Sequence, residues 1–408
     1  MKILHTSDWH LGHKLYGKQR YQEFSLFLDW LATVIEEQKI EALLIAGDIF
    51  DGQTPSNRVL EIYYRFLSHI SRSPCRHVII IGGNHDSPTL LNAPQELLRF
   101  LDIHVIGRVP ENLEDEIILL RDDLNRPELM ILAVPYLRDR DLRSTDAGES
   151  LHDKEKKLLS GIQDHYSKLY ELARKQQKSL ENHVPLVAMG HLFCQGGTTS
   201  QGDGVRELYV GSLVHVGLDT FPAEIDYLAL GHLHLPQKVK KQENRRYSGA
   251  PLAMSFNEAH KQKCVLAVTL APRFTVDEIP VPCFQALQTI TGDLVQILEA
   301  IKHLKEKKQS ILLEINYSGQ ALLDDLQEQV YTAVADSPLE VLRIYNKRIY
   351  DHILQQTSEI KTLEELSPIQ VFRQCLDMHE IDDDQQQEML LTFETALAAL
   401  QNEDSSLE

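Results

Sequence analysis

Short apolar runs alternate with longer amphipathic stretches along the first part of the chain. Five of these runs stop at a glycine or serine that precedes an acidic, amide or imidazole side chain. The runs are too short for helices, so we predict that each is a buried β-strand. They begin at Ile3, Ala42, Val78, Pro185 and Tyr227.

The stretches between the runs have helical spacing. Apolar residues recur at three- and four-residue steps over residues 24–35 and 59–70. A further helix is expected at 93–101. A charged helix at 158–180 has a single apolar stripe, which favours a solvated insertion. Alternating strands and helices predict an α/β fold, whose sites lie at the carboxyl ends of the strands.

Two further segments follow the predicted α/β domain of residues 1–279. Residues 280–350 have the pattern strand, helix, strand, helix, strand, which predicts a small α/β domain. Residues 351–408 contain a helix start at Ser367-Pro368, with an N-cap serine and a first-turn proline, and then a second helix. Two such short helices have too little core to stand alone, so we expect this segment to dock on another surface, either a partner protein or residues 280–350 of the same chain.

Composition restricts the class of protein. The 408 residues are 43% apolar, enough for a large core, and contain no apolar run of membrane-spanning length. The N-terminus enters a strand without a basic and apolar leader, so the cytoplasm is the expected location. The five cysteines are scattered, which argues for reduced thiols and against a zinc knuckle or a disulfide framework.

The charge of the chain bears on nucleic-acid binding. A formal net charge of -19 opposes it, because phosphate recognition depends on Lys and Arg. Residues 351–408, however, carry 14 acidic and two basic side chains, so most of the acidity lies in the last segment. Carboxylates that bind metal would be neutralised as well. The charge therefore weakens a DNA hypothesis without excluding it.

The polar residues at the five strand ends form a set of candidate metal ligands. They are Asp8, His10, Asp48, Asn84, His191, His232 and His234. Mixed oxygen and nitrogen ligands favour Mn, Fe or Zn over Mg or Ca. Seven ligands are too many for one ion, so we predict two ions and a bridging group, for which the carboxylate of Asp48 is suited. Any one of these histidines alone would more often be structural; the repetition at five strand ends carries the prediction.

The blocks that contain these residues resemble the signature of the calcineurin-like metallophosphoesterases. The blocks are Asp8-Trp9-His10, Gly47-Asp48 to Asp51, Gly83-Asn84-His85-Asp86, Gly190-His191 and Gly231-His232-Leu233-His234. Their order and the segments after residue 280 are similar, more narrowly, to the nuclease subunits of bacterial SbcCD exonucleases. The resemblance implies a β-sandwich flanked by helices, a capping domain and two Mn²⁺ ions, with Mg²⁺ or another divalent ion as the alternative.

The resemblance also implies roles for individual residues. The ligand sets are Asp8, His10 and His234 for one ion, Asn84, His191 and His232 for the other, and Asp48 for both. His85 is left over, so we expect it to act as a general acid or to stabilise charge on the departing sugar oxygen, with an eighth ligand as the alternative. In related phosphoesterases the second acid of the Gly-Asp-x-x-Asp block orients this histidine. That acid is Asp51 here, and Asp86 is the other choice.

Two classes of function follow. The first is a metal-dependent DNA nuclease, acting as a double-strand exonuclease and a single-strand and hairpin endonuclease in DNA repair or recombination. It would work with an SbcC-like ATPase bound by the C-terminal helices, because the chain itself has no P-loop. The alternative is a phosphoesterase of small phosphodiesters with an interaction tail. Gly52 follows Asp51 where protein phosphatases have arginine, which argues against phosphoprotein substrates.

Basic residues outside the predicted metal site are candidate DNA contacts. They are Lys14, Arg20, Lys240 and Arg245, with Lys238, Lys241, Arg246 and Arg343 as further ones. The resemblance also implies a homodimer within a heterotetramer. The helices of residues 24–35 and 59–70 are expected to form it through their apolar stripes if these are exposed; the alternative is that the stripes are buried in the chain's own core.

Overall fold

The computed structural model of the chain describes residues 1–142, 151–194, 216–319 and 325–346, with isolated positions between 369 and 393. The chain divides into two compact units. One unit contains residues Met1–Ile315 and Leu323–Ile344, and the other contains Asn316–Leu322 and Tyr345–Glu408. Nearly all of the predicted docking segment, residues 351–408, lies outside the described residues, so its helices stay a prediction.

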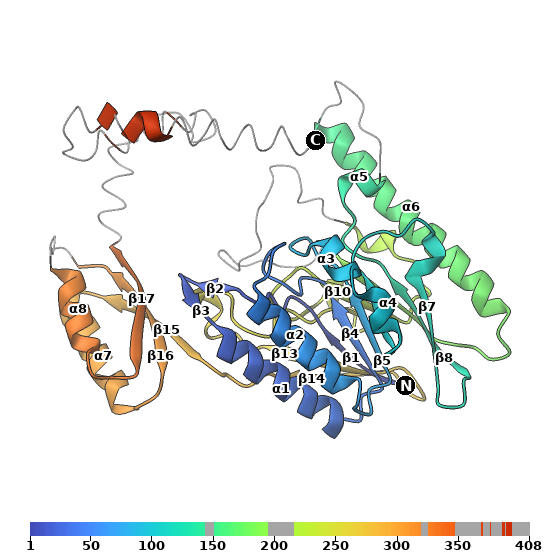
Figure 1. The fold of residues 1–408 in the computed structure, drawn as a ribbon, viewed down its shortest axis with the longest axis horizontal. Coiled ribbons are helices and arrows are strands. Elements are labelled where there is room, and N and C mark those ends of the chain that lie inside the picture. The colour runs from blue at the N-terminus through green and yellow to red at the C-terminus, as the bar shows by residue number, and fades with distance from the viewer. Residues whose placement is uncertain are drawn as a thin grey trace. The chain divides into compact units, whose positions relative to one another are not determined.

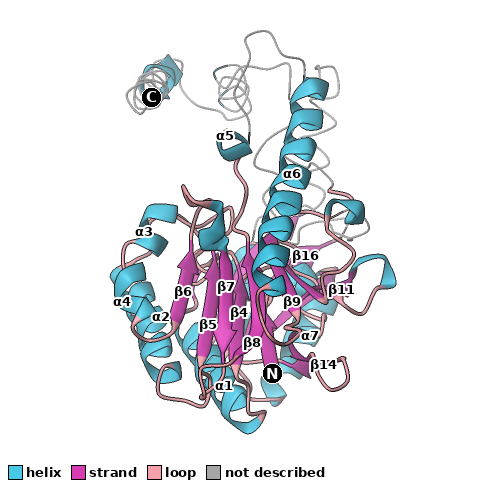
Figure 2. Ribbon diagram, turned by 90° about the vertical axis from the view of Figure 1, so that its right-hand side faces the viewer, coloured by secondary structure: helices cyan, strands magenta, loops and turns pink. Residues whose placement is uncertain are grey.

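Two six-stranded sheets form the centre of the first unit (Figures 1 and 2). The first sheet has the order β14 (Thr275–Pro280), β13 (Cys264–Thr269), β1 (Lys2–Thr6), β4 (Ala42–Ala46), β5 (His77–Ile81), β6 (Ile103–Ile106). The second has the order β11 (Gln237–Lys238), β12 (Arg245–Tyr247), β10 (Tyr227–Gly231), β9 (Leu186–His191), β8 (Pro127–Ala133), β7 (Ile117–Arg121). All five predicted strands are present, and each lies inside a sheet.

The central strands of both sheets are parallel. β1, β4, β5 and β6 pair in parallel in the first sheet, and β8, β9, β10 and β12 do so in the second. Because the carboxyl ends of parallel strands share one edge of a sheet, the polar residues after β1, β4 and β5 lie side by side. The same holds for the residues after β9 and β10.

The two sheets pack face to face around a buried apolar core. Successive side chains of a strand point to opposite faces, so Ile3 of β1 joins the core between the sheets while Leu4 packs under the helices. Val187 and Met189 of β9 contribute to the same inter-sheet core. This arrangement confirms the expected β-sandwich flanked by helices.

Helices α1 (Tyr21–Glu37) and α2 (Asn57–Ile70) cover the first sheet. Ser56 caps α2 by accepting a hydrogen bond from the Val59 main-chain N–H. The apolar stripes of both helices are buried against the sheet, with Phe27 and Ile70 fully buried. The side chains of these stripes are therefore part of the chain's own core and are not available for a dimer surface, while the homodimer itself stays a prediction.

Helix α6 (Leu151–Lys178) covers the second sheet, where a solvated insertion was predicted. Tyr166, Leu169 and Ala173 are fully buried in the core under this sheet. The Tyr166 hydroxyl also donates a hydrogen bond to the Met189 main-chain oxygen of β9, 3.1 Å away. A single apolar stripe is what a helix lying on a sheet needs, so the stripe did not distinguish the two arrangements.

Shorter elements complete this part of the chain. The helix predicted at 93–101 is present as the shorter α4 (Gln95–Arg99), with Pro94 at its N-cap, and a separate helix α3 (Pro88–Asn92) precedes it. A proline lacks the N–H that would continue α3 into α4, which accounts for the separation. The other elements are β2 (Lys14–Leu15), β3 (Lys18–Gln19), α5 (Asp139–Leu142) and four short 3₁₀ helices at Leu113–Glu116, Leu218–Thr220, Val239–Lys241 and Phe256–Glu258.

The strand and helix pattern predicted for residues 280–350 is also present. It consists of β15 (Ala286–Gly292), α7 (Leu294–Glu306), β16 (Ile311–Tyr317), α8 (Leu326–Val334) and β17 (Leu339–Asn346), with the three strands in one sheet of that order. A capping box between Asp293 and Gln296 begins α7. Among the described helices, none has the length and apolarity needed to cross a membrane.

Candidate metal centre

The ends of five strands from both sheets meet at one place. The Asp8 main-chain N–H donates to the Gly47 oxygen, joining the segments that follow β1 and β4, at 3.0 Å. The His191 ring donates from Nδ1 to the Ala46 oxygen at 2.9 Å, which joins the second sheet to the first. All seven predicted ligands lie at this junction, as their mutual distances show.

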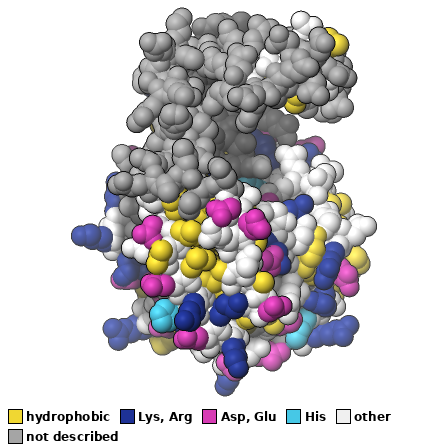
Figure 3. Space-filling view, turned by 90° about the vertical axis from the view of Figure 1, so that its left-hand side faces the viewer, with side chains coloured by type: hydrophobic (Ala, Val, Ile, Leu, Met, Phe, Trp, Pro, Cys, Tyr) yellow, Lys and Arg dark blue, Asp and Glu magenta, His cyan; other side chains and the backbone are white. Residues whose placement is uncertain are grey.

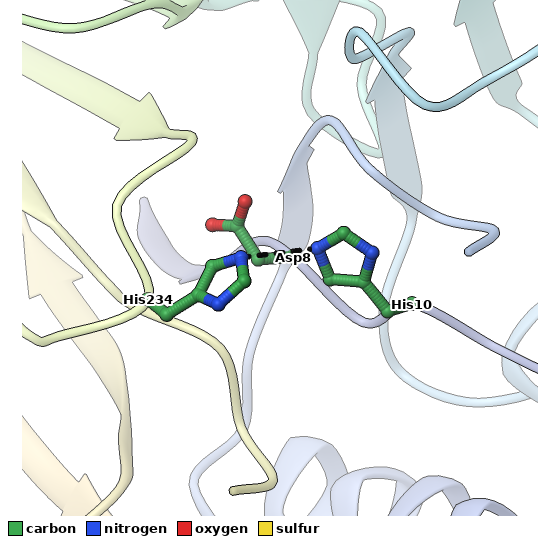
Figure 4. A group of neighbouring side chains, drawn as sticks. All are labelled: Asp8, His10 and His234. Carbon is green, nitrogen blue, oxygen red and sulfur yellow. Dashed lines mark hydrogen bonds between the residues drawn. The ribbon is translucent and has the colours of Figure 1, made fainter. Parts of the chain in front are cut away.

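Asp8, His10 and His234 form the first group of donors (Figure 4). All three are buried, and His10 Nε2 lies 3.1 Å from His234 Nε2. Donor atoms that share an ion at about 2.0–2.2 Å lie roughly 3–3.5 Å apart, so these two nitrogens fit one ion. Asp8 is held by the His232 main-chain N–H at 2.9 Å and by the Ser7 hydroxyl.

Asn84, His191 and His232 form the second group. Asn84 Oδ1 lies 2.9 Å from His191 Nε2 and 3.1 Å from His232 Nδ1. Asp48 stands between the groups, because its Oδ2 is 3.3 Å from His191 Nε2 and 3.6 Å from His10 Nε2. A single carboxylate oxygen is thus within reach of both groups, which is the arrangement expected of a bridging ligand.

The backbone at these residues is strained. Four of the seven donors have positive φ angles: Asp8 at 53°, His10 at 45°, Asp48 at 50° and His232 at 99°. Residues other than glycine rarely adopt this conformation, and it costs about 1–3 kcal/mol at each position. Such strain is concentrated at functional sites. The strained backbone therefore lowers the stability of the fold, and it places these four side chains in the site.

Glycine before a ligand lets the segments approach closely. A Cβ atom on Gly83 would lie 2.1 Å from Asp48 Oδ1 and 2.3 Å from the Asp48 main-chain nitrogen. Gly47, with a φ of 87°, has no room for a Cβ either, because His191 Nδ1 would be 2.3 Å away. These two glycines are required for Asp48 to stand between the two groups.

The charges of the site suit a divalent cation. Burial raises the pKa of Asp48, but His191 and His10 outweigh it and hold the pKa well below its usual range. Burial lowers the pKa of His232 to about 3, so this imidazole is neutral and can act as a ligand. Burial lowers the pKa of His191 as well, yet the Asp48 carboxylate raises it to about 9. A metal ion would displace the proton of such an imidazole, and ionised carboxylates with deprotonated imidazole nitrogens are donors for Mn²⁺ or Zn²⁺, so the residues fit the predicted metal pair.

His85 lies beside the two groups, and its ring is 4.8 Å from that of His10 between centroids. Its Nδ1 donates to the main-chain oxygen of Asp51 at 3.0 Å. In this bond Nδ1 carries the hydrogen, which fixes the tautomer of the neutral ring. Nε2 is the ring nitrogen that does not take part in the bond. The predicted partners of His85 were the side chains of Asp51 or Asp86; among the described contacts, the main chain of Asp51 holds this role.

The two acids have other partners. The Asp51 carboxylate lies 3.0 Å from His13 Nδ1 and 3.5 Å from His10 Nδ1, so it supports a ligand of the first group. Asp86 is fully buried and accepts hydrogen bonds from the main-chain N–H groups of Gly83 and Phe50. Asp86 thereby ties the segment after β5 to the segment after β4.

Arg20 and Arg245 were predicted to contact DNA, and the structure contradicts both predictions. Arg20 is only 4% exposed and donates to both oxygens of Glu23 and to the Ala253 main-chain oxygen. Arg245 is 5% exposed and donates to the main-chain oxygens of Ile225 and Ala223. Both guanidinium groups are satisfied inside the protein, so neither can reach a phosphate.

The remaining basic candidates differ in availability. Arg246 is 2% exposed and pairs with Glu278 and Glu243, which excludes it too. Lys14 and Lys240 are exposed. Figure 3 shows one face of the molecule on which the described Lys and Arg side chains are interspersed with Asp and Glu. The basic side chains on that face do not by themselves mark a path for DNA.

Some residues of the site carried no signal in the sequence. The Ser7 hydroxyl contacts Asp8 Oδ2 at 2.5 Å and the Ser248 hydroxyl at 2.8 Å, so these serines orient a ligand. His13 supports Asp51 in the same way. Ser248 and Asp8 are distant in the chain and meet only through the fold. His13 lies three residues after His10, and that short spacing was the one clue available.

The fold and the site together define a calcineurin-like phosphoesterase. Residues 1–236 match the family model described as calcineurin-like phosphoesterase, and the chain belongs to that family. Residues 283–380 match the SbcD_C model, described as type 5 capsule protein repressor C-terminal domain. The sandwich, the five strand ends and the sequence match agree on this class.

Curated relatives narrow the family. The chain is 34% identical over 414 residues to the SbcD subunit of the nuclease SbcCD from Escherichia coli strain K12, covering 99% of each protein. It is 33% identical to the protein of that name from Rhodobacter capsulatus, over 84% of this chain and 85% of the relative. The Bacillus subtilis protein is 35% identical, over 67% of each chain. The chain is thus a member of the SbcD family.

Proposed function

We propose that this protein is a metal-dependent DNA nuclease, the phosphodiester-cleaving subunit of an SbcCD-type complex. The observation that supports this most strongly is the pair of donor groups that share Asp48 Oδ2, within 3.3 Å of one group and 3.6 Å of the other. Membership of the SbcD family supports DNA as the substrate. Double-strand exonuclease and single-strand or hairpin endonuclease activities are the forms we propose.

The ligands would hold two divalent cations, with Mn²⁺ as our first choice. The first set is Asp8, His10 and His234, the second is Asn84, His191 and His232, and Asp48 belongs to both. Bound as a pair, such ions neutralise phosphate charge and lower the pKa of a water molecule toward neutrality. With such a water as the nucleophile, no side chain has to attack the phosphorus. The role of the protein is to position groups around the phosphodiester.

His85 would serve the departing oxygen. The Asp51 main-chain oxygen holds the ring through Nδ1, so Nε2 carries the proton when the ring is charged. As the bond between phosphorus and the sugar oxygen breaks, Nε2–H donates to that oxygen or stabilises its charge. The oxygen of the attacking water would form the new bond to phosphorus while its proton passes to solvent, and the sugar oxygen would leave with the proton from His85. The strand break then produces one phosphate end and one hydroxyl end.

The partners are proposed on the resemblance and on the family. An SbcC-like ATPase would bind residues 351–408, and two copies of this chain would form a homodimer within a heterotetramer. Deleting residues 362–408 is expected to keep metal-dependent cleavage of single-stranded DNA and to abolish binding to the ATPase. A pull-down in which the shortened chain still captures the ATPase would disprove the docking role. We also propose that the complex works in the cytoplasm on nucleoid DNA.

A comparison of substrates tests the proposed function. Blunt duplex and hairpin DNA are incubated with the protein and Mn²⁺, with and without a purified SbcC-type ATPase, beside bis(p-nitrophenyl) phosphate. We expect cleavage of DNA that Asp48→Ala abolishes. Glu116→Gln is the matched control, since Glu116 is a buried acid whose partner is His165. Cleavage of the small diester without DNA cleavage in the presence of the ATPase would favour the alternative, a small-phosphodiester enzyme.

A further inference from the structure

Glu258 is a buried acid directly behind a metal-ligand histidine. It ends the 3₁₀ helix Phe256–Glu258, in the segment between β12 and β13, and only 1% of its surface is exposed. A buried carboxylate is costly unless each of its oxygens has a partner. The partners of the two Glu258 oxygens are unequal, and the difference points to a role.

One oxygen of Glu258 is fully used. Oε2 accepts a short hydrogen bond from Lys263 Nζ and another from the Met254 main-chain N–H at 3.3 Å. Lys263 is itself buried, and its Nζ also donates to the His234 main-chain oxygen at 3.0 Å. The lysine therefore compensates the charge of Glu258 and ties it to the segment that carries His234.

The other oxygen of Glu258 faces His234. Oε1 lies 3.8 Å from His234 Nδ1, and neither atom has a hydrogen-bond partner among the described residues. Both atoms are buried, so water does not easily satisfy them. The separation is about 1 Å longer than a hydrogen bond. A small rotation of either side chain would bring the two unsatisfied atoms into contact.

The other nitrogen of the His234 ring points into the site. His234 Nε2 faces His10 Nε2 at 3.1 Å (Figure 4), so Nδ1 is the outer nitrogen. A ligand histidine usually donates its outer N–H to a carboxylate, which fixes the ring and makes the inner nitrogen a stronger donor. His10 shows the same design, since the Asp51 carboxylate lies 3.5 Å from its Nδ1.

We propose that Glu258 is a positioning residue that accepts the Nδ1–H of His234 and thereby aims Nε2 at the first metal ion. This inference rests on the proposed function, because it assumes that His234 is a ligand. Lys263 completes the unit by holding both Glu258 and the His234 main chain. Glu258 thus acts through His234 and does not touch the substrate.

Metal binding of three variants tests this role. Full-length wild type, Glu258→Gln and Glu258→Ala are titrated with Mn²⁺, and free Mn²⁺ is followed by electron paramagnetic resonance. Loss of such a supporting carboxylate typically weakens metal affinity about 10–100-fold. We expect one of two ions to bind that much more weakly in Glu258→Ala. Glu258→Gln should lie between, because its amide oxygen still accepts the hydrogen bond but carries no charge.

Thermal unfolding of the metal-free proteins shows whether each variant is folded at the temperature of the titration. Glu258→Gln keeps the shape of the side chain but removes the counter-charge of the buried Lys263, so its Tm should fall. Weaker binding of one ion by the folded variant, with the other ion bound as in wild type, supports the proposal. Glu116→Gln, which removes the charge of a buried acid paired with His165, should bind both ions as wild type does. If Glu258→Ala does not fold, Glu258→Gln decides.

Two results would overturn the proposal. Wild-type affinity for both ions in a folded Glu258→Gln variant would show that the carboxylate does not support His234, while the two-metal function would stand. Failure of the wild type to bind any Mn²⁺ would refute the proposed function, and this inference with it. The two failures are therefore distinguishable in one titration series.

Discussion

Gly83→Ala adds one methyl group at the point where the segments after β4 and β5 meet. The new Cβ would lie 2.1 Å from Asp48 Oδ1 and 2.3 Å from the Asp48 main-chain nitrogen. Ordinary carbon contacts are about 3.5–4.0 Å, so Asp48 must move by more than about 1 Å. Since Asp48 stands between the two donor groups, we expect the methyl group to disturb both metal ions at once.

The size of the effect follows from this displacement. A metal site tolerates about 0.2 Å in its ligand distances, and a misplacement of 1 Å costs roughly 100-fold in rate. Overpacking lowers the free energy of unfolding by about 1–3 kcal/mol, which a domain of this size withstands. We therefore expect Gly83→Ala to fold, to bind Mn²⁺ weakly at both sites, and to hydrolyse bis(p-nitrophenyl) phosphate about 100-fold more slowly or worse.

Gly52→Ala is the matched control, because no atom beyond its two neighbours in the chain lies within 4 Å of its Cβ position. It should keep wild-type metal binding and activity, and urea unfolding should show little loss of stability. Wild-type affinity for two Mn²⁺ ions together with full activity in Gly83→Ala would refute this reasoning. Such a result would mean that Asp48 need not stand where the structure places it.

The remaining predictions concern catalysis, the metal bridge and the pH dependence of stability. His85→Ala should keep both ions yet lose cleavage. If this variant instead loses metal, His85 is a ligand. Asp48→Ala should lose both ions and cleavage, as judged by metal analysis; retention of either ion at full affinity would contradict the bridging role. Burial lowers the pKa of His5 to about 3, below its unfolded value near 6.5, so the folded state takes up fewer protons than the unfolded chain between these values. Stability should therefore fall with decreasing pH, by up to about 1.4 kcal/mol per pH unit from this group, and His5→Asn should have a shallower slope between pH 6.5 and 4 in urea unfolding. Equal slopes would show that His5 does not stay neutral in the fold.

The strands and the donor set could be predicted because their signals are local. A short apolar run that ends in a glycine and a polar residue marks both a buried strand and its tip. Parallel pairing then brings the tips together, as it does for Asp8, Asp48 and Asn84. The ligands that follow β9 and β10 belong to the second sheet. Their strands show the same pattern of a short apolar run that ends in a glycine and a polar residue. Their meeting with the first sheet depends on sandwich packing, which the family resemblance implied.

Other features could not be predicted because they depend on tertiary contacts. In the sequence, nothing distinguishes Arg20 from an exposed basic residue. Its burial depends on its hydrogen bonds to Glu23 and to the Ala253 main chain. His85 is held by a main-chain oxygen, and because every residue has such an oxygen, the sequence does not reveal this contact. Glu258 lies 24 residues after His234 with no motif around it, and only the fold brings the two together.

A crystal structure of the protein soaked with Mn²⁺, with anomalous scattering recorded at the manganese edge, tests the central claim most directly. Two anomalous peaks about 3.5–4 Å apart are expected, with Asp48 in contact with both. His10 and His234 should contact one peak, and His191 and His232 the other. A single peak, or two peaks of which only one touches Asp48, would contradict the shared metal pair.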